Sequence, residues 1–385
     1  MKKALFALST GAFALGIAEF VIMGILVNIS DSLGVTVTKG GEMISAYATG
    51  VCVGAVAVLL LRRMRLNNIM KVLASVIFLG NLLSALAPEF YILLGARFIS
   101  GLPHGAYFGV GAIVARHFAR PGREVQAVAM LIAGMTVANL AGVPLVTWLT
   151  NLVSWRLAFF VASMLGLMTL LMMGHWLPSV EALPDNGFKG QFKFLRTLPP
   201  WLIVGGILVG QTGVYCWYSY IDPLLTEVTG FRATDLSWLM FVCGLGMVVG
   251  NLLAGRLSIR LKPALVAGLM QSSALISLWL IYLWGAIPWA MVLLMFLCTL
   301  AMFGSGGPLQ SSIVEYSRGG EMLGASLIQI AYNAGNAIAA WIGGRVIMAT
   351  GSYSAPALAG IPLVAIGSVL IFILYFYRER KKTFS

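Results

Sequence analysis

Three ionisable residues lie inside long apolar segments of this sequence, where a charge is costly. They are Glu19, Arg97 and His104. A charged side chain at the centre of a membrane helix costs roughly 3 kcal/mol on the mildest insertion scale. A carboxylate can take up and release a proton, a guanidinium keeps its charge, and an imidazole titrates near neutral pH. These residue types therefore point to the binding and relay of protons.

Spacing along the chain suggests how the three residues meet. His104 follows Arg97 by two helical turns, so both are expected on one helix face, with Gly101 between them leaving room for a ligand. Glu19 lies about 16 residues beyond Lys3, roughly 24 Å along a helix, in the outer half of a membrane. We predict an ion pair between Glu19 and Arg97, direct or through water. Glu19 would be the proton-coupling carboxylate and Arg97 the group that sets its ionisation.

Each of these residues also has a purely structural interpretation. Glu19 and Arg97 can form a salt bridge that only fixes helix packing. His104 is expected either to bind substrate or relay protons, or to be a packing residue beside Pro103. The sequence leaves these alternatives open.

The elements that hold these residues are apolar helices. Of 385 residues, 59% are hydrophobic and 10% charged, which is too apolar for one soluble core. A span needs roughly 20 apolar residues to cross about 30 Å of hydrocarbon. An all-α membrane protein with twelve transmembrane helices is therefore predicted. The expected limits are 4–27, 42–61, 68–87, 91–115, 124–149, 156–177, 201–222, 235–255, 264–283, 288–312, 322–347 and 354–377.

Basic residues mark the orientation of these spans. Most of the 25 Lys and Arg residues fall in alternate loops that are cytoplasmic if the N-terminus is cytoplasmic, as the positive-inside rule requires. The protein is therefore expected in a bacterial inner membrane, with both termini on the cytoplasmic side. The positive-inside distribution alone explains the net charge of +12. The expected partner is therefore the lipid bilayer, and no nucleic-acid partner is expected. The Cys and His residues are too scattered for disulfides or a metal site.

The second half of the chain repeats the first. Matched pairs are Gly50 with Gly246, Gly54 with Gly250 and Asn139 with Asn336. Such parallel repeats predict two pseudo-symmetric six-helix bundles that suit alternating access. The expected domains are an N-terminal bundle (1–177), a cytoplasmic linker loop (178–200) and a C-terminal bundle (201–385).

Aromatic and amide residues dominate the polar content of the second half. Residues 211–222 combine a glutamine with a cluster of aromatic rings, which suits a planar or amphipathic solute. An interfacial aromatic belt is the alternative and is expected for Tyr220, and Asp222 is expected to be solvated. In span eleven, polar residues recur at helical spacing. They are expected either to line a cavity or to form hydrogen bonds between helices. The substrate-binding candidates are His104, Asn139, Gln211, Tyr215, Trp217, Tyr218, Gln329, Tyr332, Asn333 and Asn336.

Three motifs carry a family resemblance. They are GIAEFVIMG at 16–24, RFISGLPHGA at 97–106 and GMTVANLAGVP at 134–144. They resemble the first-helix acidic segment, the span-four arginine motif and the span-five antiporter motif of the major facilitator superfamily. More narrowly, the chain looks like the arabinose-efflux-permease-like group of its twelve-helix drug:proton antiporter branch. The resemblance implies a monomer that exports a small molecule, such as a sugar, drug or nucleoside, in exchange for protons. Proton-coupled uptake is the alternative.

One loop departs from the family pattern. Between spans two and three, the family's Gly and Asp are missing before the basic residues, so any latch must use other partners. The gating candidates are Arg62, Arg63, Glu124, Arg256 and Glu321. For the two glutamates, a favourable interaction with a helix N-terminus is the competing explanation.

The sequence favours neither an enzyme nor a receptor. It contains no phosphate-binding Gly-Lys-Ser/Thr loop and no set of acid, base or metal ligands beyond the group of Glu19, Arg97 and His104. No catalytic residue, cofactor or metal is therefore expected. A non-transporting receptor, the less favoured alternative, usually carries a signalling domain. The expected energy source is an ion gradient.

Overall fold

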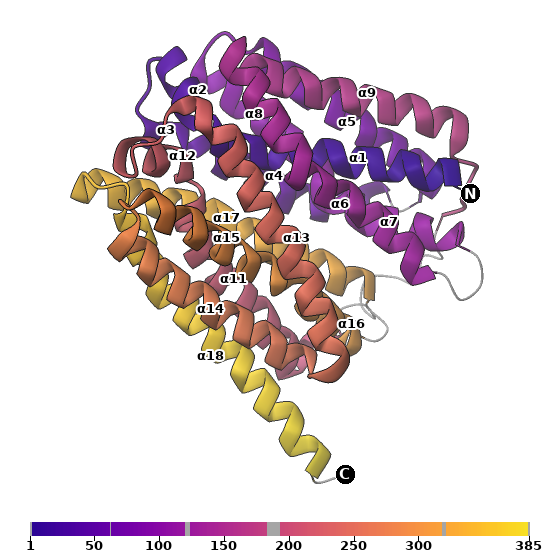
Figure 1. The fold of residues 1–385 in the computed structure, drawn as a ribbon. Helices are drawn as coiled ribbons and strands as arrows, with labels where there is room; N and C mark the ends of the chain where they lie inside the picture. Colours follow the sequence, from indigo (N-terminus) through magenta and orange to yellow (C-terminus); the bar gives the residue numbers. More distant parts are fainter. Residues whose placement is uncertain (1, 62, 120–123, 183–192, 318–320, 384–385) are drawn as a thin grey trace. The chain divides into compact units, whose positions relative to one another are not determined.

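The computed structural model describes residues 2–61, 63–119, 124–182, 193–317 and 321–383, and these form helices joined by turns (Figure 1). Ten helical segments among the described residues are long and apolar enough to cross a membrane. The other two predicted spans correspond to α4 (Glu42–Ala57) and α17 (Glu321–Thr350). In lipid, a helix satisfies its backbone hydrogen bonds internally. The predicted all-α membrane fold is confirmed.

The chain divides into two compact units. Unit 1 comprises Met1–Asn186 and Leu236–Phe241, and unit 2 comprises Gly187–Asp235 and Val242–Ser385. The helices of unit 1 are α1 (Lys2–Phe20), η1 (Val21–Gly24), α2 (Leu26–Ser32), α3 (Val37–Gly40), α4, η2 (Val58–Leu61), α5 (Leu66–Leu86), α6 (Phe90–His117), α7 (Glu124–Val137), η3 (Ala138–Gly142), α8 (Val143–Leu152) and α9 (Arg156–Trp176).

Unit 2 contains the second set of long helices. α14 and α15 both begin at a proline, where the missing N–H costs nothing. The helices are η4 (Lys193–Arg196), α11 (Leu198–Tyr218), α12 (Ile221–Pro223), η5 (Leu224–Val228), η6 (Ala233–Asp235), α13 (Leu236–Arg260), α14 (Pro263–Trp284), α15 (Pro288–Gly304), α16 (Gly306–Tyr316), α17 and α18 (Ala355–Thr383). The first residues of α13 belong to unit 1.

The two units use the same pattern of helix packing. In unit 1, α1 packs against α7 and α9, and α5 packs against α6 and α9. In unit 2, α11 packs against α17 and α18, and α14 packs against α15 and α18. These pairs are the same spans counted within each half. The repeat predicted from the sequence is therefore present in the packing.

Glycines bring the repeated helices into backbone contact. Side-chain atoms added at Gly50 and Gly54 of α4 would meet the carbonyl oxygens of Phe98 and Leu102 on α6. In unit 2, Gly250 of α13 has the same relation to a carbonyl oxygen on α15. Because glycine lacks a side chain, two helix backbones can approach this closely only at such positions.

Gly54→Val is expected to lower the free energy of unfolding by about 3 kcal/mol or more, because the valine displaces α4 from the backbone of α6. Denaturant unfolding of purified protein in detergent measures this change. Gly95→Val is the matched control, since a side-chain atom at exposed Gly95 of α6 meets nothing within 4 Å. Equal destabilisation by both variants would contradict the packing argument.

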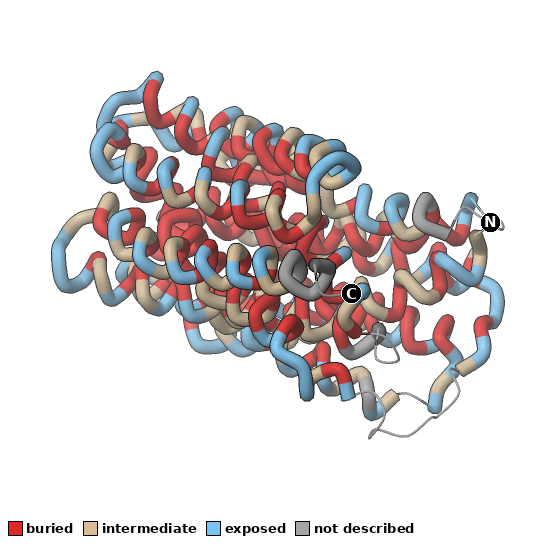
Figure 2. The backbone as a smooth tube through the Cα atoms, turned by 90° about the horizontal axis from the view of Figure 1, so that it is seen from below, coloured by how far each residue is buried: buried red, intermediate tan, exposed pale blue. Residues whose placement is uncertain are grey.

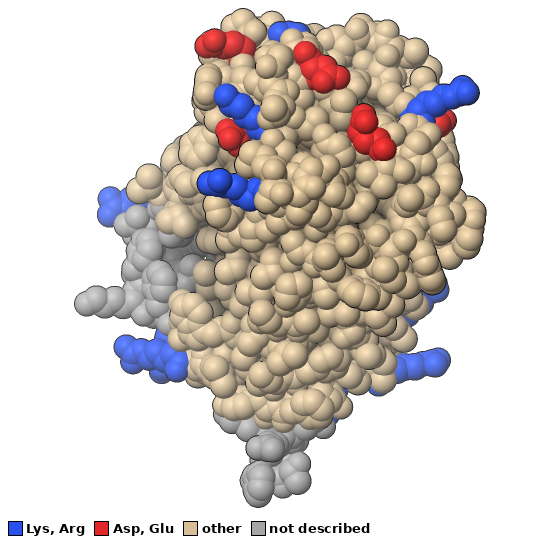
Figure 3. Space-filling view, turned by 90° about the vertical axis from the view of Figure 1, so that its left-hand side faces the viewer, with Lys and Arg blue, Asp and Glu red and all other residues tan. Residues whose placement is uncertain are grey.

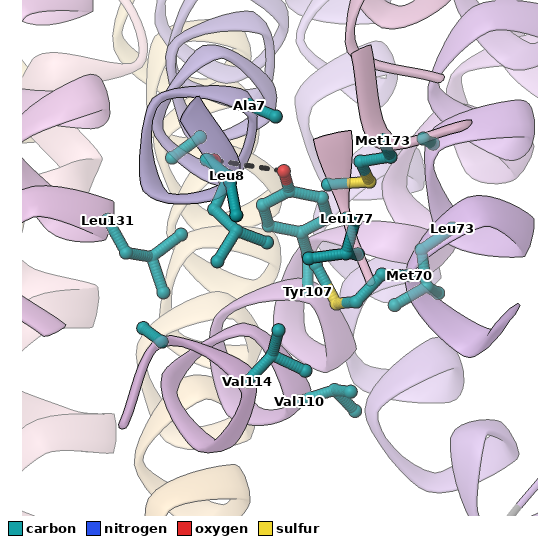
Figure 4. Close-up of a cluster of buried hydrophobic side chains, with 14 of the residues drawn as sticks. Ala7, Leu8, Met70, Leu73, Tyr107, Val110, Val114, Leu131, Met173 and Leu177 are labelled. Atoms are coloured by element: carbon teal, nitrogen blue, oxygen red, sulfur yellow. Dashed lines mark hydrogen bonds between the residues drawn. The ribbon is translucent and has the colours of Figure 1, made fainter. Parts of the chain in front are cut away.

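A hydrogen bond anchors α1 to α6 inside the apolar core of unit 1. The fully buried Tyr107 of α6 donates from its hydroxyl to the Leu8 carbonyl oxygen at 2.9 Å, among aliphatic and Met side chains (Figure 4). Gly11 provides the space, because a side-chain atom there would meet the same hydroxyl. Along the helices, buried positions alternate with exposed ones (Figure 2). Exposed positions include many large apolar residues, as lipid-facing surfaces do.

Charged side chains on the surface are concentrated in parts of it. The face in Figure 3 carries them in two groups, with a broad uncharged band between them. Lys39 of α3, outside the spans, donates from Nζ to Tyr91 Oη at 3.0 Å, and this hydrogen bond raises the pKa of Lys39. The same ammonium lies 5.3 Å from the centroid of the Phe90 ring. The short helix α3, which precedes α4, is thereby attached to the start of α6.

Candidate functional site

Glu19 occupies an enclosed position near the end of α1. Only 5% of the residue is exposed. α1 is apolar and buried along most of its length, and the chain continues from Phe20 into the 3-10 turn η1. Since α1 packs against α7, α9 and η3, it holds the carboxylate inside unit 1 and away from lipid.

The nearest ionisable neighbour of Glu19 is His104. Its Nε2 lies 3.6 Å from Glu19 Oε2, and only 2% of the histidine is exposed. The opposite ring nitrogen, Nδ1, lies 2.8 Å from the Tyr47 hydroxyl oxygen. One hydrogen-bonded histidine therefore connects α4, α6 and α1 at this point.

Arg97 is fully buried and stacked between two aromatic rings. Its guanidinium carbon lies 4.4 Å from the centroid of the Tyr47 ring and 5.1 Å from that of Phe159. None of its three side-chain nitrogens has a hydrogen-bond partner among the described residues. The guanidinium thus relies on aromatic faces for its contacts.

The predicted direct ion pair between Glu19 and Arg97 is not formed in the described structure. Glu19 contacts His104 instead, and its charge interacts with that of Arg97 only through space. Geometry explains the difference, because seven residues of α6 separate Arg97 from His104 by about 10 Å along the helix axis. The carboxylate lies at the level of His104, two turns along α6 from Arg97.

Tyr47 is the member of this cluster that sequence reasoning missed. It is 1% exposed, and it touches both His104 through its hydroxyl and Arg97 through its ring. Gly101 of α6 packs against the Tyr47 carbonyl oxygen and so brings the two helices together. A neutral tyrosine in an apolar helix gives no charge signal in the sequence.

Asn139 lies on another element that packs against α1. It sits in the π-helix η3 and is 3% exposed, with neither amide atom hydrogen-bonded within the described residues. Gly16 of α1 permits this contact, since a side-chain atom there would lie 2.7 Å from Ala138 Cβ. π-helical turns often occur at functional sites.

In unit 2, two predicted residues, Gln211 and Tyr332, lie near the end of α15. Gln211 of α11 is 1% exposed and donates from Nε2 to Ser305 Oγ at 3.0 Å. The half-buried Tyr332 belongs to the same neighbourhood, because a side-chain atom at Gly306 would lie 3.5 Å from its hydroxyl. The second amide atom of Gln211, Oε1, has no partner in the described structure.

The polar edge of α17 continues this group. Asn333 and Asn336 are 3% and 1% exposed, and Gln329 is half-buried. Asn333 donates to the Gln329 carbonyl oxygen at 3.0 Å, but its Oδ1 and both amide atoms of Asn336 have no partner within the described chain. Gly335 packs on α11 near Thr212. We call Gln211, Ser305, Tyr332, Asn333 and Asn336 the uncharged polar cluster.

The aromatic residues at the end of α11 are all buried. The Tyr218 ring lies between two others, with its centroid 6.4 Å from that of Tyr215 and 5.7 Å from that of Trp217. Tyr220 was expected in an interfacial belt, but it is 1% exposed and donates to a backbone carbonyl of α17 at 2.8 Å. Asp222 was expected to be solvated, but it is also 1% exposed. Both expectations were wrong because neighbouring segments cover this end of the helix.

Of the gating candidates, Arg63 and Arg256 have described side chains, and neither forms a hydrogen bond or ion pair within the described part of the chain. Arg63 and Arg256 are exposed. Arg62 and the side chains of Glu124 and Glu321 lie outside the described residues. Their gating role stays a prediction.

Comparison with known proteins places the chain in a family. The family model for the Major Facilitator Superfamily matches residues 8–326. AraJ of Escherichia coli (strain K12) is 36% identical over 97% of this chain and 96% of its own length. A Helicobacter pylori (strain ATCC 700392 / 26695) protein named "Probable sugar efflux transporter" is 26% identical over 89% of this chain and 88% of its own.

A solved structure supports the same fold. The xylose transporter XylE from E. coli, in a partially occluded inward-open conformation, superposes with a TM-score of 0.75. The alignment covers 97% of each chain at 13% sequence identity. The family model over residues 8–326 and the 36% identity to AraJ show that the chain belongs to the major facilitator superfamily of membrane transporters.

Proposed function

We propose that this protein exports a small uncharged polar solute, such as a sugar or a nucleoside, in exchange for protons by alternating access. The observation that carries the proposal is the enclosed Glu19 carboxylate, which faces His104 at 3.6 Å and shares its surroundings with the charged Arg97. No covalent chemistry is needed, because a proton taken up here changes the charge of a buried group.

Proton uptake changes the balance of charge inside unit 1. Arg97 keeps its positive charge, so an ionised Glu19 offsets it and a protonated Glu19 leaves it without compensation. Buried charge is costly, so the two protonation states favour different conformations of the surrounding helices. A proton gradient can therefore bias the conformational equilibrium of the transporter.

The uncharged polar cluster of unit 2 favours a neutral substrate. Gln211, Asn333 and Asn336 offer buried amide atoms without partners within the described chain. Such atoms suit the hydroxyl groups of a polyol or a sugar, and the nearby aromatic rings suit its apolar faces. The related Helicobacter pylori protein is named for sugar efflux.

The proposed setting is a bacterial inner membrane with both termini in the cytoplasm, and the protein acts as a monomer. Residues 178–200, of which 183–192 lie outside the described part of the chain, are proposed to be the cytoplasmic linker between the two bundles. One proton crossing a membrane potential gains about 2.3 kcal/mol per 100 mV, which is sufficient to sustain a solute gradient.

The experiment is proton flux in proteoliposomes that contain a pH-sensitive dye. Adding a transported pentose, hexose or nucleoside is expected to move protons opposite to the solute, whereas organic cations and anions of similar size are not. Empty liposomes are the control. Proton movement in the same direction as the solute would establish uptake instead, and solute movement without proton flux would refute coupling.

A further inference from the structure

Glu19 needs a route by which protons reach it, because its carboxylate is almost completely enclosed. Among the described residues, one hydrogen bond and one longer polar contact lead to this carboxylate through His104. This connection runs from the Tyr47 hydroxyl to His104 Nδ1 at 2.8 Å, across the ring, and from Nε2 to Glu19 Oε2 at 3.6 Å. The rings of Tyr47 and His104 meet edge-on, at an interplanar angle of 89°.

Counting protons along this connection ties the histidine to the charge of Glu19. A neutral imidazole carries one N–H, and a neutral phenol carries one O–H. An ionised Glu19 only accepts, so His104 presents Nε2–H to it and Nδ1 accepts from Tyr47. A protonated Glu19 donates its own O–H to Nε2, so Nδ1 carries the proton and donates to the Tyr47 oxygen.

We infer that Tyr47 and His104 form a proton relay that loads Glu19, and that the tautomer of His104 follows the protonation of Glu19. The inference rests on the proposed proton coupling and adds its route. A hydronium ion, reaching the buried Tyr47 hydroxyl when alternating access opens the site, gives its proton to the Tyr47 oxygen and leaves as water. The original phenol proton passes to Nδ1, and the Nε2 proton passes to the carboxylate. Counting the hydronium, two O–H bonds and one N–H bond break, and two O–H bonds and one N–H bond form. The reverse sequence unloads Glu19.

The surroundings of the relay favour the neutral forms of Tyr47 and His104. Three titratable or charged groups interact with Glu19, namely Arg97 and His104 of α6 and Tyr47 of α4. The described parts of α7, α8, α9 and η3 add no such interaction. The Arg97 guanidinium over the Tyr47 ring disfavours a second positive charge on His104 and stabilises partial negative charge on the phenol.

The test is nitrogen NMR of [15N]histidine-labelled protein in lipid nanodiscs over a pH series. The chain has three histidines, so His117→Gln and His175→Gln leave one labelled ring. We expect the proton on Nε2 at high pH and on Nδ1 at low pH. Glu19→Gln is expected to abolish this exchange of tautomer. Tyr47→Phe keeps the ring beside Arg97 and is expected to remove the tautomer preference.

Tyr107→Phe is the matched control, because Tyr107 is a buried tyrosine of the same unit that donates to a backbone carbonyl instead. It should leave the His104 spectrum unchanged. A pH-independent tautomer in the wild type, or an imidazolium with both nitrogens protonated, would overturn the relay. The spectra require neither solute nor gradient. Failure of proton flux in proteoliposomes would therefore refute coupling without deciding the relay, and the converse also holds.

Discussion

Glu19→Gln is expected to abolish solute-driven proton movement while solute exchange down its own gradient continues. Glutamine has nearly the same shape and cannot ionise, so the helices around α1 still pack but the site no longer changes charge. The expected loss in proton flux is at least about a hundredfold, the lower end of what a positioned proton-transfer group contributes. Parallel assays of dye-reported proton flux and of labelled-solute counterflow separate the two activities.

Glu89→Gln is the matched control for this substitution. Glu89 is an exposed acid that precedes α6, and its side chain makes no capping hydrogen bond there. It should retain wild-type proton flux. If Glu19→Gln kept its coupling, the proton-carrying group would have to be another buried acid, and Asp222 of unit 2 would be the next to test.

The charged members of the site were predictable from the sequence, but their contacts were not. Glu19, Arg97 and His104 stand out because each places an ionisable group in an apolar helix. Whether Arg97 or His104 meets the carboxylate depends on the register between α1 and α6, because two helical turns separate the two residues. Sequence spacing fixes positions along a helix and leaves the register between helices open.

Tyr47 shows a second limit of sequence reasoning. Its phenol fits an apolar helix without a hydropathy penalty, so its importance comes from its neighbours. Those neighbours follow from the close approach of α4 to α6 at Gly50, Gly54 and Gly101. The sequence repeat identified two of these glycines as matched positions and did not indicate which helix they would contact.

The repeat was more informative for the amides. Asn139 and Asn336 were paired by their separation in the sequence, and each is buried in its own unit with both amide atoms unpartnered in the described chain. By contrast, Tyr220 and Asp222 were judged by distance from the end of a span. That measure ignores the segments that cover them, so it predicted exposure where there is burial.

Arg97→Met is expected to stabilise the protein and to abolish proton coupling. The buried guanidinium has no hydrogen-bond partner in the described chain, and the desolvation of an ion costs several kcal/mol. The cation–π contacts of Arg97 with two aromatic rings stabilise the guanidinium by about 2 kcal/mol each. Methionine fills similar volume without that cost, so a gain of about 1–4 kcal/mol is expected. Thermal unfolding in detergent, followed by tryptophan fluorescence, measures it.

Arg345→Met is the control for this measurement, because Arg345 lies over Trp341 at 5.6 Å but is exposed on α17. It should change stability by less than about 0.5 kcal/mol. Coupling is expected to fail in Arg97→Met because an ionised Glu19 then has no positive charge to offset it, so Glu19 stays protonated. A less stable Arg97→Met protein would mean that the guanidinium holds a partner in the membrane, such as water or an anion. An Arg97 variant that is more stable and inactive would show that this buried charge is retained for transport at the expense of stability.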